Sequence, residues 1–139
     1  MTLHSRASKI IDDFNFFNSW EEKYEHIIDL GKSLPELNES LKTDAALIRG
    51  CQSKVWMHCE YKNKKLYFYA DSDALIAKGL VALIIKLYSG LSAEDVLDEN
   101  VDFLKQIGLQ EHLSMTRSNG LNMMLEKIRN YGKKYRKNG

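Results

Sequence analysis

A reactive cysteine is the first chemistry that this sequence offers. Cys51 follows Gly50 and precedes two small polar residues, Gln52 and Ser53, and the next apolar run begins only at Val55. Glycine accepts backbone angles that other residues resist, so it can present the following side chain on a turn. A structural cysteine normally lies within a run of regularly spaced apolar residues. Cys51 lies just outside the run that begins at Val55. The pattern predicts that Cys51 is a nucleophile on a loop.

Two cationic residues flank this loop, Arg49 and Lys54. Positive neighbours favour the thiolate over the thiol, and the thiolate is the reactive form of cysteine. We therefore expect Arg49 and Lys54 to lower the pKa of the Cys51 thiol.

Metal binding and hydrolysis are the other kinds of cysteine chemistry to weigh. Cys59 alternates with Met57 on one face of an expected strand, so core packing is its better interpretation, and His58 would point to the opposite face. The spacing from Cys51 to Cys59 matches no common zinc pattern, and no metal site is predicted. A cysteine hydrolase would need a histidine base. His58 and His112 are the plausible bases, and neither carries a hydrolase signature.

Composition limits the classes of function further. The chain has 139 residues, of which 44% are hydrophobic and 28% charged, as expected for one soluble globular domain over residues 1–139. A net charge of +1 gives no bulk electrostatic case for a nucleic acid or membrane partner. Residues 126–139 hold six basic residues against one acidic, which favours a solvated helix end over an RNA-binding tail. Two cysteines and no signal-peptide pattern favour a reducing, cytoplasmic setting.

Hydrophobic periodicity predicts the elements that must position Cys51. Two short strands, residues 55–61 and 66–70, are expected to form a hairpin about a polar turn. Helices are expected over residues 8–17, 20–31, 74–88, 93–97, 101–109 and 121–131. Residues 34–48 could hold a strand or a helix. The whole predicts an α+β fold, a small antiparallel sheet packed by helices.

Polar residues at two helix starts have structural explanations. Asp71, Ser72 and Asp73 are predicted to cap the core helix, with their side chains accepting free backbone N–H groups. Arg117 is expected just before the last helix, where an arginine gains nothing from the helix dipole. We expect Arg117 to be a solvated surface residue. The alternative is that its planar guanidinium group forms paired hydrogen bonds with a partner. In the core helix, Gly79 would permit a close approach by another backbone.

Several motifs, in this order, resemble those of the SufE family. The likeness runs from about Phe14 to Ile128. The residues that carry it are Trp20-Glu21-Glu22-Lys23-Tyr24, Leu30-Gly31-Lys32, Leu34-Pro35, Gly50-Cys51-Gln52-Ser53-Lys54-Val55-Trp56, Asp71-Ser72-Asp73-Ala74, Lys78-Gly79-Leu80 and Arg117-Ser118-Asn119-Gly120-Leu121.

The resemblance implies a covalent sulfur carrier in iron–sulfur cluster assembly rather than a stand-alone enzyme. Cys51 would take persulfide sulfur from a partner cysteine desulfurase that uses pyridoxal phosphate, stimulate it, and pass the sulfur to an iron–sulfur scaffold. The resemblance also implies a fold like that of the scaffold IscU, no cofactor in this chain, and partner contacts near Asp73 and Arg117. The supporting loop would be formed by Arg49, Gly50, Gln52 and Ser53.

Some alternatives stay open at this point. Both the SufE and the CsdE systems fit, with a SufS-like or a CsdA-like desulfurase, and a homodimer is as compatible with the sequence as a monomer. The other hypotheses for function are a non-covalent interaction module, in which the Cys51 thiol is incidental, and a Cys/His hydrolase.

Overall fold

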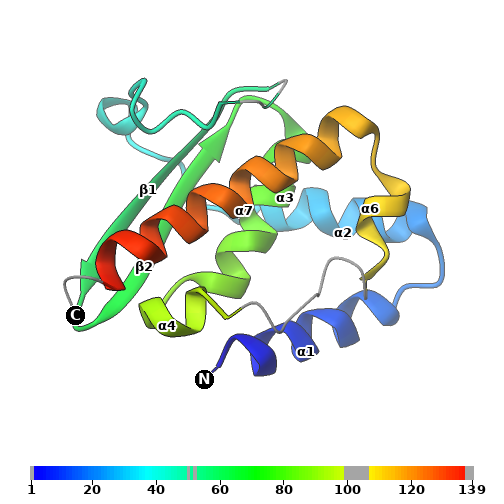
Figure 1. Cartoon of the computed structure of the whole chain (residues 1–139). Helices are drawn as coiled ribbons and strands as arrows, with labels where there is room; N and C mark the ends of the chain where they lie inside the picture. Colours follow the sequence, from blue (N-terminus) through cyan, green and yellow to red (C-terminus); the bar gives the residue numbers. More distant parts are fainter. Residues whose placement is uncertain (1, 50, 52, 99–106, 137–139) are drawn as a thin grey trace.

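A two-stranded antiparallel sheet lies against a layer of helices, as the cartoon of the chain shows (Figure 1). Strand β1 (Val55–Lys62) pairs with strand β2 (Lys65–Ser72) along their whole length. The predicted hairpin and the predicted α+β class are therefore confirmed. The computed structural model describes residues 2–49, 51, 53–98 and 107–136.

The hairpin turns over two residues, Asn63 and Lys64, with φ angles of 53° and 64°. Two consecutive left-handed residues are typical of the tight turn whose twist matches that of paired strands. One face of the sheet is buried against the helices. Its core residues are Val55, Met57, Leu66, Phe68 and Ala70.

Helix α3 (Leu75–Tyr88) is the core helix and packs between β2 and helix α2 (Trp20–Lys32). The predicted close approach at Gly79 is a contact with α2. A Cβ built on Gly79 would lie 2.7 Å from the carbonyl carbon of Ile27 and closer still to its oxygen. A Cβ on Gly31 would lie 2.7 Å from the backbone nitrogen of Gly79. The two glycines let the helix backbones touch.

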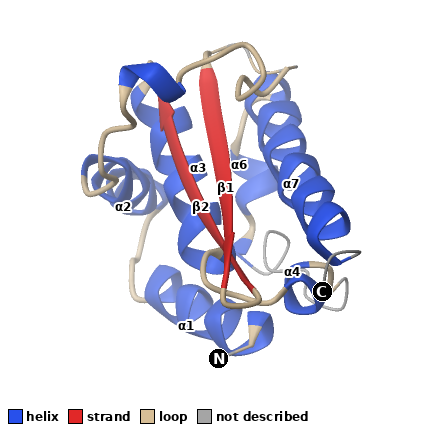
Figure 2. Cartoon of the chain, turned by 90° about the vertical axis from the view of Figure 1, so that its left-hand side faces the viewer, coloured by secondary structure: helices blue, strands red, loops and turns tan. Residues whose placement is uncertain are grey.

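The remaining helices surround this pair. In the rotated view, α2 and α7 lie on opposite sides of the hairpin, with α3 behind it (Figure 2). No helix among the described residues has the length and apolar character needed to cross a membrane. The other elements are α1 (Leu3–Asn15), the 3₁₀ turn η1 (Glu39–Leu41), α4 (Ala93–Val96), α6 (Leu109–His112) and α7 (Met115–Arg136).

Two helices begin earlier than the sequence indicated. Helix α1 begins at Leu3 because Thr2 and Ser5 form a reciprocal capping box. Helix α7 begins at Met115, and the Ser114 hydroxyl accepts the N–H of Arg117 at 3.2 Å. Arg117 therefore lies in the first turn of α7 and not before it. Of the helix expected over 101–109, residues 101–106 lie outside the described residues.

The predicted acidic cap of α3 is wrong. Asp71 and Ser72 are the last residues of β2, and Ala74, at the start of α3, makes no side-chain capping bond. Asp71 is only 4% exposed, and its carboxylate accepts the N–H groups of Ser72 and Leu37 at 2.8 and 3.3 Å. It also pairs with Lys78 at 3.4 Å. Burial acts to raise the pKa of Asp71, but the two N–H groups and Lys78 outweigh it and lower the pKa.

Candidate functional site

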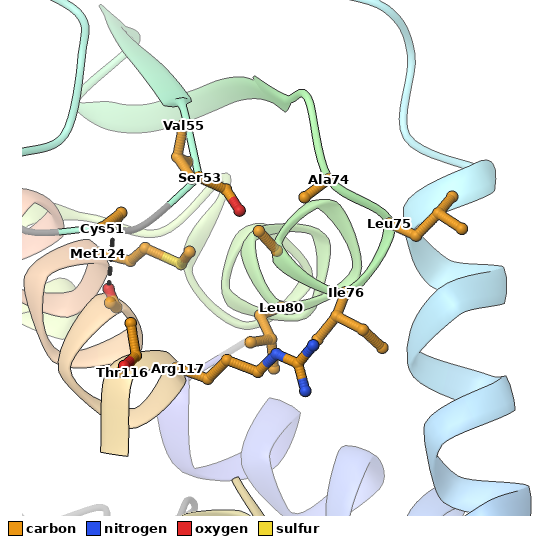
Figure 3. Close-up of a pocket in the computed structure, with 12 residues that line it drawn as sticks. Cys51, Ser53, Val55, Ala74, Leu75, Ile76, Leu80, Thr116, Arg117 and Met124 are labelled. Atoms are coloured by element: carbon orange, nitrogen blue, oxygen red, sulfur yellow. Dashed lines mark hydrogen bonds between the residues drawn. The ribbon is translucent and has the colours of Figure 1, made fainter. Parts of the chain in front are cut away.

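The Cys51 side chain is half-buried at a cavity of about 300 Å³ between α3 and α7. Apolar side chains from β1, α3 and α7 line most of the wall, and Ser53 and Arg117 add polar groups near the mouth (Figure 3). The apolar residues that matter most here are Val55, Ile76, Leu80 and Met124.

Helix α7 approaches the thiol through a glycine. The Cys51 S–H donates to the carbonyl oxygen of Gly120 at an S–O distance of 3.7 Å, the dashed line in Figure 3. A Cβ on Gly120 would stand 3.5 Å from the Cys51 sulfur. A side chain at Gly120 would therefore contact the sulfur atom, and glycine leaves that position clear. A thiol can make this hydrogen bond and a thiolate cannot, so the contact favours the protonated form.

The loop that carries Cys51 is closed at its base by hydrogen bonds to the backbone of its flanking residues. On the strand side, Ile48 donates to Val55 at 2.8 Å. On the α3 side, the Asp73 carboxylate accepts the N–H of Lys54 at 3.0 Å, and the Ser72 hydroxyl donates to the Lys54 carbonyl at 2.8 Å. The base of the loop is thus tied to the end of β2.

The loop residues predicted from the sequence separate into different environments. Ser53 faces the Cys51 cavity, whereas Arg49 is exposed and lines a different hollow with Asp44 and Lys127. Gly50 and Gln52 were also predicted to support the site, and both lie outside the described residues.

The expectation that Arg49 and Lys54 lower the pKa of Cys51 is wrong. Burial of the thiol raises its pKa above the ordinary 9.0. Arg49 and Lys54 are both exposed, and neither lines the cavity. A side chain that points into water is screened and does little for a half-buried sulfur. The thiol is therefore held in its less reactive form.

The other predicted site residues are brought to the same end of the molecule. Arg117 reaches across the cavity mouth from α7 toward α3, as Figure 3 shows. Asp73 is exposed and holds the base of the loop through Lys54. Asp73 therefore acts on the loop, and Arg117 belongs to the cavity wall.

Gly120 and Met124 are cavity residues that the sequence interpretation missed. The sequence placed Gly120 in the segment just before the last helix and Met124 on the apolar face of that helix. They are four residues apart and therefore share one face of a helix. The four-residue spacing of Gly120 and Met124 could have indicated that both face the cavity. It was missed because the helix was expected to begin only at residue 121.

Cys59 behaves as a core residue, as predicted. It packs against the hydrophobic core, and burial raises the pKa of its thiol to about 12, against a smaller opposing effect of Lys134. Among the described residues, no group of three or more His, Cys, Asp and Glu side chains could hold a metal ion.

The two histidines considered as hydrolase bases are engaged elsewhere. The Nε2 atom of His58 lies 2.7 Å from the carbonyl oxygen of Leu41. The His112 ring stacks on Trp20, with ring centroids 3.8 Å apart. Neither histidine lines the cavity of Cys51. The geometry does not favour a Cys/His pair.

Known proteins similar to this chain share one family. Residues 8–132 match the SufE family, described as an Fe-S metabolism associated domain. The chain is 42% identical over 130 residues to an uncharacterized SufE-like protein of Rhizobium etli, covering 90% of this chain and 88% of the relative. It is 40% identical over 126 residues to an uncharacterized SufE-like protein of Rhizobium meliloti, covering 87% of this chain and 90% of the relative.

A solved structure shares the fold. The solution structure of a hypothetical protein from Thermus thermophilus matches with a TM-score of 0.77, at 19% sequence identity, over 93% of this chain and 94% of that one. The family match spans nearly all of the described residues, including the Cys51 loop and both helices that form the cavity. This chain belongs to the SufE family of proteins associated with iron–sulfur metabolism.

Proposed function

We propose that this chain is a covalent sulfur carrier that takes sulfur from a cysteine desulfurase onto Cys51. The observation that carries the proposal is a half-buried thiol at the mouth of an apolar cavity whose described lining residues include no histidine or carboxylate. Such a lining offers no general base for hydrolysis, but it can hold a group as small and polarisable as sulfur.

The transfer step is an exchange at sulfur. The Cys51 thiol loses its proton, and its sulfur attacks the outer sulfur of the persulfide on the desulfurase cysteine. A bond forms between the Cys51 sulfur and that outer sulfur, while the bond to the desulfurase cysteine breaks. The departing desulfurase thiolate takes up a proton. The reaction has no net oxidation, as in thiol–disulfide exchange, and it needs no cofactor in this chain.

The cavity suits the product of this step. A persulfide is a reversible modification that other thiols can remove by exchange. The apolar wall from Val55, Leu80 and Met124 limits the access of other thiols to the outer sulfur, and Arg117 at the mouth offers a positive charge to a persulfide anion. We propose that Arg117 also contacts the donor.

The cavity rim has surface that a partner can cover. Leu75, which lines the cavity, is 65% exposed, and Met115 at the start of α7 is 81% exposed. Large apolar side chains that are exposed on the helices of a cavity favour a protein-binding surface. We assign this rim, with Asp73 nearby, to a SufS-like or CsdA-like desulfurase that uses pyridoxal phosphate.

The same site would then deliver sulfur onward. By removing persulfide sulfur from its partner, the chain would speed desulfurase turnover, and a later contact would pass the sulfur to an iron–sulfur scaffold. This assigns the chain to sulfur transfer in the cytoplasm, as a carrier and activator and not as a stand-alone enzyme.

Intact-protein mass spectrometry tests the proposal directly. The chain is incubated with desulfurase, pyridoxal phosphate and free cysteine, and then weighed with and without reductant. We expect one extra sulfur that reductant removes and that maps to Cys51. Cys59→Ser is the matched control and should load normally. If Cys51→Ser still gains the sulfur and still stimulates the desulfurase, the proposal is wrong.

A further inference from the structure

An aromatic cluster lies at the start of α2, outside the Cys51 cavity. The Trp20 ring stacks on His112 with centroids 3.8 Å apart and an interplanar angle of 20°. The Tyr24 hydroxyl donates to the carbonyl oxygen of His112. Lys23 adds its ammonium group over the Trp20 ring, 4.7 Å from the centroid. Two side chains of α2, those of Trp20 and Tyr24, thus contact His112 at the end of α6. Figure 1 shows α6 beside α2.

The segment they hold leads straight into the cavity wall. Helix α6 ends at His112, and α7 begins at Met115, so only two residues separate them. The Ser114 hydroxyl accepts the N–H of Arg117, and the Ser114 carbonyl accepts that of Ser118 at 2.9 Å. With so short a connection, the position of His112 fixes where the first turn of α7 begins.

The opposite wall of the cavity is held by the other end of α2. Gly31 contacts the backbone of Gly79 in α3, and the residues just before Gly79 line the cavity. Helix α2 therefore contacts both walls, α3 through its glycine and the α6–α7 corner through its aromatic residues. The distance between the walls depends on both contacts.

We infer that Trp20, Tyr24 and His112 are positioning residues of the Cys51 site. They hold the α6–α7 corner at the spacing from α3 that keeps the thiol half-buried beside Gly120. Their link to sulfur transfer rests on the proposed function. Their effect on the exposure of Cys51 does not depend on that function.

The test measures Cys51 alkylation by iodoacetamide, quantified on the peptide that contains Cys51. His112→Ala removes the stacked ring but leaves the carbonyl that accepts from Tyr24. An aromatic pair of this kind shifts an equilibrium by about two- to tenfold. We expect His112→Ala to speed alkylation of Cys51 by about that factor, and Tyr24→Phe, which removes only the hydroxyl, to add to it.

The pH dependence of alkylation supplies a second readout. Because burial raises the pKa of the Cys51 thiol, opening the wall should move the alkylation profile of His112→Ala toward lower pH. His112→Phe restores a flat ring against Trp20 and should restore both the rate and the profile. A loss of stability alone is tested by removing a stacked ring elsewhere on α7, at Tyr135.

The matched control lies at the far end of α7. Tyr135 stacks on Tyr61 with centroids 4.8 Å apart and an interplanar angle of 8°, and neither ring lines the Cys51 cavity. Tyr135→Ala should leave the alkylation rate of Cys51 unchanged. The inference is overturned if His112→Ala alkylates like the wild type, or if Tyr135→Ala speeds alkylation equally.

The alkylation assay needs no desulfurase, so the two proposals can fail separately. A chain that gains no sulfur from a desulfurase would refute the proposed function while the alkylation result still stands. A chain that loads sulfur normally, yet shows no effect of His112→Ala on alkylation, would refute the positioning role alone.

Discussion

The contact between α2 and α3 makes a quantitative prediction for Gly79→Ala. A Cβ on Gly79 would lie 2.6 Å from the Cγ2 atom of Ile27 and 2.7 Å from its carbonyl carbon. The side-chain atom can rotate away, but the carbonyl belongs to the backbone of α2. The helices must therefore separate or distort, and the added methyl group cannot be absorbed by a rotamer change.

Two opposing effects set the magnitude. Alanine is better than glycine within a helix by about 1 kcal/mol, which favours the variant. Overpacking of a tight interior costs about 1–3 kcal/mol and occasionally more. Since the clash involves the backbone of the principal helix pair, we place the cost at the upper end, so the free energy of unfolding should fall by about 2 kcal/mol. For a chain of this size, that lowers Tm by about 5–10 °C.

Gly120→Ala is the matched control, since it is the same exchange in another helix. Its Cβ would stand 3.5 Å from the Cys51 sulfur, an ordinary contact distance. The helix-propensity gain then stands alone, so Gly120→Ala should equal the wild type or exceed it by up to about 1 kcal/mol. Calorimetry and urea unfolding measure both variants. If Gly79→Ala matches Gly120→Ala in stability, the two helices do not touch through their backbones, and the reasoning fails.

Three further outcomes are expected. Asp73→Ala removes the acceptor for the Lys54 N–H and should speed alkylation of Cys51 about two- to tenfold, whereas Asp73→Asn keeps an acceptor and should resemble the wild type. Folding lowers the pKa of Asp71 below its ordinary 3.8. The Asp71 carboxylate therefore gives its full stabilisation above pH 3.8, and this stabilisation is lost as the pH falls through the pKa that Asp71 has in the folded protein. Urea unfolding in acid should therefore show a shallower loss for Asp71→Asn than for the wild type. In folded protein, alkylation of Cys51 should still increase above pH 9.0, and Cys59, with a pKa of about 12, should react more slowly still; in urea the two thiols should react alike.

The hairpin was predictable because its signals are local. Alternation along β1 and a polar turn are properties of adjacent residues, and they needed no knowledge of the helices. Gly79 could also be interpreted correctly, since a glycine in the middle of an apolar helix indicates a close neighbour. The neighbour itself, Ile27 of α2, follows only from the tertiary packing.

The electrostatic environment of Cys51 was not predictable in the same way. Arg49 and Lys54 are its neighbours in sequence, but the direction of a loop side chain depends on what covers the loop. Here α7 covers it, so the cation that lines the cavity is Arg117, which is distant in sequence. The acidic cap failed for a related reason. Asp71 and Ser72 continue the ladder of β2, because partners on β1 extend the sheet beyond the apolar run.

A raised thiol pKa has a consequence for how a carrier of this design would work. Oxidation and exchange both proceed through the thiolate, so a half-buried Cys51 that donates to Gly120 reacts slowly with unintended partners. The same burial slows the intended reaction until the loop or the α7 wall moves and exposes the sulfur. If the proposed sulfur transfer takes place, that movement, and not the intrinsic reactivity of the thiol, would limit it. A donor that contacted the exposed side chains of Leu75 in α3 and Met115 in α7 would touch the helices of both walls. Its binding energy would then drive the opening, and the sulfur would become reactive only where a donor is already bound.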